Sequence, residues 1–478
     1  MRDYLKFYVD GQWVEPTGTR TRDVINPATE EVAGRISMGE KEDVDRAVAA
    51  ARKAFESYSR ITREERVALL ERIAAGFQAR VPDLAAAMTE EMGCPAWLAQ
   101  KAQIPLPLAH INTAIEVLKK FQFDEVRGKS MIRKEPIGVC ALISPLNWPV
   151  SVIITKVMPE LETGCTVVMK PSEYSPFSAH ILAEIMDAAA VPPGVFNLVN
   201  SDGPTVGIAL SSHPDIDMVS ITGSTRAGID VARNAATTVK RVHQELGGKS
   251  PNIMLGDADM EKAVTSGVRF IMLNSGQSCS APSRMLVPRS RIAEVIAIAK
   301  SVAESTTVGP PDSGAYLGPL VNEQQWNKVQ GLIRKGIEEG ATLIAGGPGK
   351  PAGLERGYYV KPTIFAAVSN DMTIAREEIF GPVLLILCYD EVEDAIRIAN
   401  DTTYGLAAYV HAGSIEKARE VGARIRAGQV FLNGDMELLD PTAPFGGFKM
   451  SGNGREWGDH AFEAFLEVKA FVGYNPAG

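Results

Sequence analysis

The sequence predicts an α/β protein with a mainly parallel sheet, and two features of the chain carry this prediction. Short apolar strands alternate with helical segments between residues 138 and 234, and a second series of helical segments follows Gly248. Such alternation is typical of βαβ units, in which successive strands run parallel. The chain has 478 residues, more than one ordinary hydrophobic core holds, so we expect two or three domains.

The segments before residue 138 predict a hairpin, three helices and an exposed excursion. Residues 7–14 favour a hairpin whose turn is Asp10-Gly11, because Asp-Gly is a common two-residue hairpin turn. Apolar residues at helical spacing predict helices over 41–55, 63–92 and 96–121. The charged run 123–129 is expected to lie on the surface, before the first parallel strand.

The alternating series and the segments after it supply the remaining elements. Apolar strands are expected at 138–143, 166–169, 195–199 and 217–221. The helices that follow these strands are expected at 150–162, 177–190, 205–211 and 224–234. The second series predicts helices at 260–272, 291–303, 323–339 and 392–400. Ligands of such sheets bind beyond the carboxyl ends of the strands, so the turns after the first strands are candidate sites.

Composition and charge exclude several classes of function. The hydrophobic content of 45% and the charged content of 22% are typical of a soluble globular protein. The net charge of −9 argues against a surface for nucleic acid or for anionic membranes, which would need clustered Lys and Arg. No apolar signal segment is visible at the N-terminus. The most apolar stretch, 139–158, contains two prolines, Asn147 and Lys156, which is unfavourable for a transmembrane helix.

The cysteines and histidines favour a cytoplasmic protein without a metal. The five cysteines are scattered, with no CxxC pair and no disulfide framework, as is usual in a reducing compartment. The six histidines are isolated, and none has metal-ligand spacing. His243 lies close to Glu245 and is interpreted as a packing or hydrogen-bonding residue rather than a ligand.

Cys279 is the strongest candidate for a chemical role. It lies in the polar run 274–280, Asn-Ser-Gly-Gln-Ser-Cys-Ser, whereas a structural cysteine usually lies among apolar neighbours. A nucleophilic cysteine needs an approachable sulfur in a polar setting. A lone cysteine in a polar loop is more often structural than catalytic. Its pairing with Glu245, in the run Gln-Glu-Leu-Gly-Gly-Lys, makes a nucleophile with a nearby base the better interpretation.

Two turns after predicted strands are candidates for a nucleotide site. Gly223 and Ser224 begin a helix, whose N-terminus favours a phosphate, although a capped helix start explains them about as well. Lys170 and Glu173 follow a buried strand and could bind ribose hydroxyls, although an exposed ion pair is the other interpretation. A carboxylate at Glu173 would repel a 2′-phosphate and favour NAD over NADP, whereas Arg226 could tolerate that phosphate.

The turn 144–149 carries a third candidate, Asn147. A side-chain amide exposed after a strand can donate a hydrogen bond to a developing oxyanion. Asn before Trp-Pro also favours a plain turn, so this signal is weak alone.

These runs, with Glu-Glu-Ile-Phe-Gly-Pro at 377–382 and Pro-Phe-Gly-Gly-Phe-Lys-Met-Ser-Gly at 444–452, resemble the NAD(P)-dependent aldehyde dehydrogenase superfamily of the hydrolytic, non-CoA-acylating type. The resemblance extends over nearly the whole chain, and Glu-Leu-Gly-Gly-Lys and Gly-Gln-x-Cys are its most specific motifs. It implies the aldehyde dehydrogenase fold, with a Rossmann-like cofactor domain, an α/β catalytic domain and a small β oligomerisation element. The implied boundaries are 1–118 with 138–248 for the cofactor domain, 249–449 for the catalytic domain, and 119–137 with 460–478 for the oligomerisation element. That last element would pair across a homodimer, or a homotetramer built from dimers.

The resemblance also implies roles for individual residues. Cys279 would be the nucleophile, Glu245 the general base, and Asn147 an oxyanion donor together with the N–H of Cys279. Lys156 and Glu456 would relay the proton from the base, with a structural ion pair as the alternative. NAD, with NADP as the alternative, would be bound by Ser144, Lys170, Ser172, Glu173, Gly223, Ser224, Gly247, Glu378 and Phe380. Gly247 would also let Glu245 swing between positions. The aldehyde would contact Trp148, Val152, Thr155, Ser278, Ser280, Asp435, Met436 and Phe445.

The implied reaction oxidises an aldehyde to the carboxylic acid through a cysteine thiohemiacetal and a thioester. A medium-sized aliphatic or aromatic aldehyde is expected, because the segments around the tunnel show no cation for a substrate carboxylate. A CoA-acylating aldehyde dehydrogenase is the first alternative, and Glu245 argues against it because that reaction needs no base for water. A non-catalytic structural relative is the second, and the joint presence of Cys279, Glu245 and Asn147 argues against it.

Overall fold

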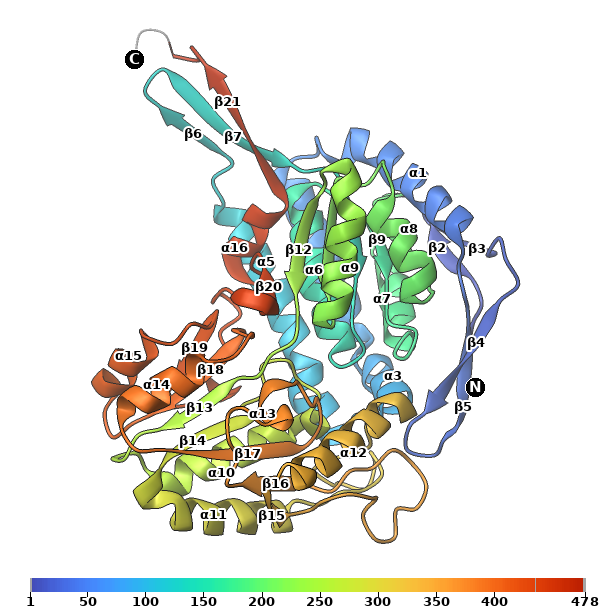
Figure 1. The fold of residues 1–478 in the computed structure, drawn as a ribbon. Coiled ribbons are helices and arrows are strands. Elements are labelled where there is room, and N and C mark those ends of the chain that lie inside the picture. The colour runs from blue at the N-terminus through green and yellow to red at the C-terminus, as the bar shows by residue number, and fades with distance from the viewer. Residues whose placement is uncertain (1, 435, 476–478) are drawn as a thin grey trace.

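The computed structural model describes residues 2–434 and 436–475, and Figure 1 shows two α/β bodies and a narrow β arm. Each body is built around its own sheet, one of eight strands and one of seven. The arm is a three-stranded sheet, and another small sheet lies at the N-terminal edge of the first body. No helix of the described residues is long and apolar enough to cross a membrane.

The eight-stranded sheet has the strand order β20-β12-β11-β8-β9-β10-β2-β3. Its five central strands, from β12 to β10, run parallel, as the sequence predicts, and the outer strands are antiparallel. Its strands are β2 (Phe7–Val9), β3 (Gln12–Val14), β8 (Val139–Ile143), β9 (Thr166–Lys170), β10 (Phe196–Leu198), β11 (Met218–Thr222), β12 (Arg241–Glu245) and β20 (Gly452–Asn453). The predicted hairpin is confirmed, since Asp10 and Gly11 join β2 to β3 with positive φ angles of 53° and 70°.

Helices cover both faces of this sheet because its strands place alternate residues on opposite sides. In β8, Cys140 and Leu142 belong to one hydrophobic core, and Val139, Ala141 and Ile143 to the other. The first core includes α2 (Arg63–Ala79), α3 (Val81–Met92), α5 (Pro105–Lys120), α6 (Pro149–Thr163) and α7 (Phe177–Ala188). The second includes α1 (Lys41–Tyr58), α8 (Ile208–Ser212) and α9 (Thr225–Ala235).

Two of the predicted helices are interrupted. The segment 63–92 forms two helices that meet at Arg80, because Pro82 has no N–H to continue the helical ladder and instead occupies the first turn of α3. The segment 96–121 begins as α4 (Ala96–Leu98), passes through a π-helical turn at Ala99–Gln103, and restarts as α5 at Pro105.

The seven-stranded sheet has the order β15-β16-β17-β14-β13-β18-β19, and all its pairs except β15–β16 are parallel. Its strands are β13 (Pro251–Met254), β14 (Arg284–Pro288), β15 (Thr342–Ala345), β16 (Thr363–Ala366), β17 (Val383–Tyr389), β18 (Ala407–His411) and β19 (Gln429–Leu432). One face packs on α10 (Met260–Met272) and α11 (Ile292–Ser305). The other packs on α12 (Glu323–Glu338), α13 (Thr373–Arg376), α14 (Val392–Asn400) and α15 (Ile415–Gly422).

The arm and the N-terminal sheet complete the fold. The arm has the order β21-β7-β6, and the charged run 123–129, expected on the surface, contains its strand β6. Its strands are β6 (Asp124–Arg127), β7 (Ser130–Pro136) and β21 (Leu466–Val472). Helix α16 (Gly458–Ala464) leads into β21 and packs near α5 (Figure 1). The N-terminal sheet contains β1 (Arg2–Tyr4), β4 (Thr21–Asn26) and β5 (Glu31–Ser37).

Candidate active site

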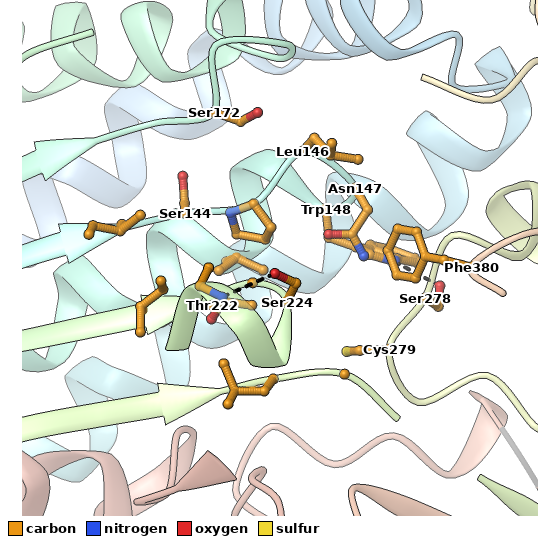
Figure 2. Close-up of a pocket in the computed structure, with 18 of the residues that line it drawn as sticks. Ser144, Leu146, Asn147, Trp148, Ser172, Thr222, Ser224, Ser278, Cys279 and Phe380 are labelled. Atoms are coloured by element: carbon orange, nitrogen blue, oxygen red, sulfur yellow. Dashed lines mark hydrogen bonds between the residues drawn. The ribbon is translucent and has the colours of Figure 1, made fainter. Parts of the chain in front are cut away.

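A cavity of about 780 Å³ contains most of the predicted site residues. The turns that follow β8, β9 and β11 line it from the first body, and loops of the second body line it from the other side. Figure 2 shows Cys279 facing the same space as Asn147 and Phe380, while Ser144, Ser172 and Ser224 lie farther along the cavity. The carboxyl ends of the parallel strands therefore meet the predicted nucleophile at one site.

The loop that carries Cys279 has an unusual backbone. Asn274 and Ser275 both adopt the left-handed conformation, with φ angles of 52° and 55°. Such conformations cost about 1–3 kcal/mol each in non-glycine residues and persist where surrounding contacts enforce them. Here the Asn274 amide donates to the carbonyl oxygens of Asn147 (2.9 Å) and Gln277 (3.2 Å). These bonds join the nucleophile loop to the turn after β8.

The sulfur of Cys279 is a thiol in this environment. Burial, together with the nearby carboxylates of Glu378 and Glu245, raises the pKa of Cys279 to about 12, although the N–H groups of Ser280 and Cys279 act in the opposite direction. The residue is only half-buried, so the sulfur remains approachable from the cavity. Attack on a substrate therefore requires a proton to leave the sulfur first.

Asn147 is fixed by three hydrogen bonds. Its side-chain Nδ2 donates to the carbonyl oxygen of Gln277 at 2.9 Å, and its own carbonyl oxygen accepts from Gln103 and Asn274. An amide nitrogen carries two N–H groups, and this contact uses one of them. The residue lines the cavity, so the second N–H can serve a ligand beside Cys279.

Glu245 lies at the end of a strand that the sequence did not predict. It is the last residue of β12, paired in register with Thr222 of β11. It is 2% exposed, and neither carboxylate oxygen has a hydrogen-bond partner among the described residues. Burial raises the pKa of Glu245 well above its ordinary value, and the charge of Glu456 adds to this effect. Glu245 is not among the described residues that line the cavity, so its carboxylate is retracted behind the cavity wall.

Lys156 and Glu456 form a buried ion pair next to the cavity. The Lys156 Nζ lies 2.7 Å from Glu456 Oε1 and donates to Ser220 Oγ at 2.8 Å, while Thr155 donates to Glu456 Oε2 at 3.1 Å. Burial would raise the pKa of Glu456, but the Lys156 ammonium and these hydrogen bonds lower it overall. Glu456 and Thr155 line the cavity, whereas Lys156 lies behind them.

The opposite end of the cavity suits a dinucleotide. Ser144 Oγ and Thr222 Oγ1 are buried without hydrogen-bond partners among the described residues, and both residues line the cavity. Ser224 caps α9 by accepting from the Ala227 N–H at 3.2 Å, so the helix N-terminus faces the cavity, where it favours an anion. Lys170 Nζ lies 3.4 Å from Glu173 Oε2. All nine residues predicted to bind the cofactor line this cavity.

Glu378 and Phe380 are held by contacts from two segments, residues 247–248 and Gln325. Glu378 accepts from the Gly248 N–H at 3.0 Å, and a Cβ at Gly247 would lie 2.5 Å from its carboxylate. The absence of a side chain at Gly247 therefore makes room for Glu378. The sequence analysis predicted a different role for this glycine, in the movement of Glu245. Phe380 has a φ of 59°, and Gln325 donates to its carbonyl oxygen at 2.8 Å.

The end of the cavity that holds Cys279, which we call the aldehyde end after the predicted ligand, is largely aromatic. Six residues predicted to contact the aldehyde line the cavity: Trp148, Val152, Thr155, Ser278, Ser280 and Phe445. Trp148 donates to Ser278 Oγ at 3.0 Å. Asp435 lies outside the described residues, and the side chain of Met436 is not described either.

Four further aromatic residues were missed by the sequence reading: Phe270, Tyr409, Phe431 and Trp457. Tyr409 and Phe431 are register partners on β18 and β19, with rings stacked 4.9 Å apart, and Phe445 stacks on Trp457 at 4.8 Å. The alternation of side chains along β18 and β19 could have predicted that Tyr409 and Phe431 lie on one face of each strand. Only the pairing of the two strands brings their rings together. No Lys or Arg lies among the described residues at this end, and no cluster of His, Cys, Asp or Glu in the described ranges could hold a metal.

Known proteins with a similar sequence or structure extend over nearly the whole chain. A sequence profile of the aldehyde dehydrogenase family matches residues 13–471. A 3-succinoylsemialdehyde-pyridine dehydrogenase from a Pseudomonas species is 56% identical over 99% of both chains. Aldehyde dehydrogenase C from Pseudomonas syringae, in a complex with NAD+ and octanal, is 53% identical with a TM-score of 0.98, over 99% of this chain and 97% of that one. An indole-3-acetaldehyde dehydrogenase of P. syringae in complex with NAD+ and IAA is 38% identical with a TM-score of 0.95, over 98% and 97% of the two chains.

Proposed function

The chain belongs to the aldehyde dehydrogenase family, and we infer from this and from its site that it oxidises an aldehyde to the carboxylic acid with reduction of NAD. One observation carries the assignment of the site: Cys279, Asn147 and the three strand-end turns line the same cavity. The hydroxyls of Ser144 and Thr222, which have no hydrogen-bond partner in the described part of the chain, and the N-terminus of α9 fit a dinucleotide. The direct test is the formation of reduced nicotinamide, followed by absorbance, with a panel of aldehydes.

We propose that Cys279 performs the first chemical step. After the thiol proton has passed to water, the thiolate attacks the carbonyl carbon of the aldehyde, forming a C–S bond and an oxyanion on the former carbonyl oxygen. The free N–H of Asn147 and the backbone N–H of Cys279 donate to this oxyanion. NAD, when bound, would supply the hydride acceptor. As the oxyanion re-forms the C=O bond, the hydride leaves the same carbon, and the product is a thioester on Cys279.

Glu245 is proposed as the base for hydrolysis of that thioester. Its carboxylate turns from its retracted position toward Cys279 and removes a proton from water, which attacks the thioester carbonyl. The C–S bond breaks, the carboxylic acid leaves, and Cys279 returns. The ion pair of Lys156 and Glu456 lies between this region and the cavity, where it supports a proton relay from the base.

Replacement of Asn147 by alanine tests the oxyanion role. We expect kcat to fall by about 100-fold or more, because one oxyanion donor is typically worth roughly 3–4 kcal/mol. The Kd of NAD, measured by titration, should change little. Unchanged turnover in N147A would remove Asn147 from this step.

The preference for NAD is expected to depend on Glu173. Its carboxylate, 3.4 Å from Lys170 Nζ, would repel the 2′-phosphate of NADP. We expect Glu173→Gln to raise the ratio of kcat/KM for NADP to that for NAD by about 10-fold, since like charges at close range cost energy on this scale. Arg226 also lines the cavity, and Arg226→Ala should lower that ratio. If neither variant changes this ratio, the 2′ position of the adenosine ribose binds away from Glu173 and Arg226.

A medium-sized aliphatic or aromatic aldehyde is the proposed substrate class. The stacked aromatic pairs Tyr409–Phe431 and Phe445–Trp457 line the aldehyde end, and cations are absent from its described lining. The names and complexes of the relatives, with a pyridine semialdehyde, octanal and IAA, agree with this class. We expect benzaldehyde and hexanal to exceed succinic semialdehyde in kcat/KM by at least about 10-fold, because a substrate carboxylate would be buried without a partner. The reverse order would contradict this assignment.

The two large sheets and the arm support the proposed division of the chain. Apart from β20, the strands of the eight-stranded sheet fall within 1–118 and 138–248, and those of the seven-stranded sheet within 249–449. We propose these as the cofactor and catalytic domains, with 119–137 and 460–478 as the oligomerisation element of a homodimer or homotetramer. Val468 and Val472 of β21 are largely exposed, and an exposed edge strand of this kind favours pairing with another chain. The five cysteines are free, in keeping with the cytoplasm.

A further inference from the structure

A row of buried polar side chains leads from the Lys156–Glu456 ion pair toward Glu245. Lys156 Nζ donates to Ser220 Oγ at 2.8 Å, and Ser220 Oγ lies 3.1 Å from His243 Nδ1. The other ring nitrogen, His243 Nε2, lies 3.5 Å from Glu245 Oε1. Parallel pairing of β11 with β12 produces this arrangement, because Ser220 and His243 are register partners and Glu245 is two residues beyond His243 on the same face.

The hydrogen bonds of this row determine which nitrogen of His243 carries the proton. An ammonium group has only donors, so Ser220 Oγ accepts from Lys156. Among the described residues, His243 Nδ1 is the only other hydrogen-bond contact of Ser220 Oγ, so the Ser220 O–H is directed to it. Nδ1 therefore acts as an acceptor, and the ring proton lies on Nε2, the nitrogen nearest Glu245. Burial lowers the pKa of His243 to about 4, with the Lys156 charge adding to this effect, so the ring is neutral at physiological pH.

The ring of His243 is held in place on the side of Glu245. A Cβ at Gly454 would lie 2.0 Å from His243 Cδ2 and 2.6 Å from Nε2, so the backbone of Gly454 packs directly on this edge of the ring. Gly454 has a φ of 84°, which glycine adopts readily. Phe465 packs edge-on against the ring, with centroids 6.4 Å apart. The Nε2–H therefore has a fixed direction.

In its retracted position, Glu245 accepts no hydrogen bond: both of its oxygens lack partners among the described residues. The charged groups that act on it are Glu456, which disfavours its ionised form, and Lys156 and Arg455, which favour it. A buried carboxylate without a donor binds a proton and is lost as a base.

We propose that His243 is a positioning residue for the base: its Nε2–H, directed by Ser220 and Lys156, donates to the retracted carboxylate of Glu245 and keeps it ready to return to the cavity ionised. A small rotation of the Glu245 side chain shortens the present 3.5 Å separation to a hydrogen bond. This role rests on the proposed function of Glu245 in hydrolysis of the thioester. It adds His243 and Ser220 to the residues on which deacylation depends, although neither contacts the reacting atoms.

The test compares His243→Phe, which removes the donor and keeps a ring, with His243→Gln, which retains a side-chain N–H. Rapid mixing with NAD and aldehyde separates the first turnover from the steady state. For H243F we expect a first turnover of one reduced nicotinamide per site, followed by a steady-state rate about 10-fold below wild type at pH 7, because a hydrogen bond to a charged group has been lost. The difference in steady-state rate between H243F and wild type should become smaller toward pH 9. Loss of the donor raises the pKa of Glu245, and a higher pH restores its ionised form. H243Q should recover most of the rate.

Ser220→Ala gives a second measurement if H243F fails to fold. It leaves the His243 ring and the Lys156–Glu456 contact in place but removes the hydroxyl that directs the ring proton, so we expect a smaller loss, about 3-fold at pH 7, again narrowing with pH. Phe465→Leu is the packing control, since it loosens the ring without removing a hydrogen bond, and it should lower Tm but not the steady-state rate. Wild-type rates at every pH in both H243F and S220A, or in S220A alone if H243F does not fold, would overturn the proposal. Absence of nicotinamide reduction by wild type with every aldehyde would instead contradict the proposed function.

Discussion

Replacement of Cys279 by alanine should abolish aldehyde oxidation, lowering kcat by about 10,000-fold or more. The effect is expected to be this large because the sulfur forms the covalent bond on which every later step depends, and removal of a catalytic nucleophile costs on this scale. The measurement is the rate of nicotinamide reduction with the best aldehyde of the panel. The affinity for NAD should remain within a few-fold of wild type, since Cys279 lies at the aldehyde end of the cavity.

Cys388→Ala is the matched control for this experiment. Cys388 is the other half-buried cysteine of the described residues, lies on β17 and does not line the cavity. C388A should keep wild-type activity, and an alkylating reagent should inactivate C388A and wild type alike. Retention of activity in C279A would contradict the covalent mechanism. Absence of both activity and cofactor binding in wild type would instead favour the non-catalytic structural relative.

Local signals predicted those parts of the fold in which neighbouring residues decide the structure. The Asp10-Gly11 turn and the helices α10 and α14 appear with the predicted bounds, because each depends on turn chemistry or on helical spacing. Strand β12 was missed because its sequence, Arg-Val-His-Gln-Glu, has no apolar run. Its polar side chains are buried through contacts with β11 and Gly454, which are distant in the sequence.

The same distinction applies to the candidate site. Motifs located Cys279, Asn147 and the residues proposed to bind the cofactor, all of which line the cavity, because each lies in a short segment whose chemistry is local. The retracted position of Glu245 and its distance from His243 depend on the pairing of β12 with β11, and no motif encodes them. The aromatic lining is likewise a product of strand pairing between β18 and β19, which brings Tyr409 beside Phe431.

Glu245→Gln should separate the two halves of the reaction. The first turnover should proceed, giving about one reduced nicotinamide per site, because Cys279 and Asn147 are intact. The steady-state rate should then fall by about 1,000-fold, within the range typical of a lost general base. Mass spectrometry of the quenched protein should find the acyl group on the peptide that contains Cys279. Added CoA that restored turnover would favour the CoA-acylating alternative.

The pH profile and a matched carboxylate give the sharpest form of this test. Burial raises the pKa of Glu245, so wild-type hydrolysis should increase as the pH rises through that pKa and the carboxylate ionises, and E245Q should lose this dependence. Glu162→Gln is the control, because Glu162 is equally buried in α6, has no hydrogen-bond partner among the described residues and lies away from the cavity. Neutralising it should leave turnover and its pH profile unchanged. Loss of the pH dependence of turnover in E162Q as well would show that neutralising any buried carboxylate changes turnover through the stability of the protein. Loss of this dependence in E245Q alone identifies Glu245 as the base that releases the carboxylic acid.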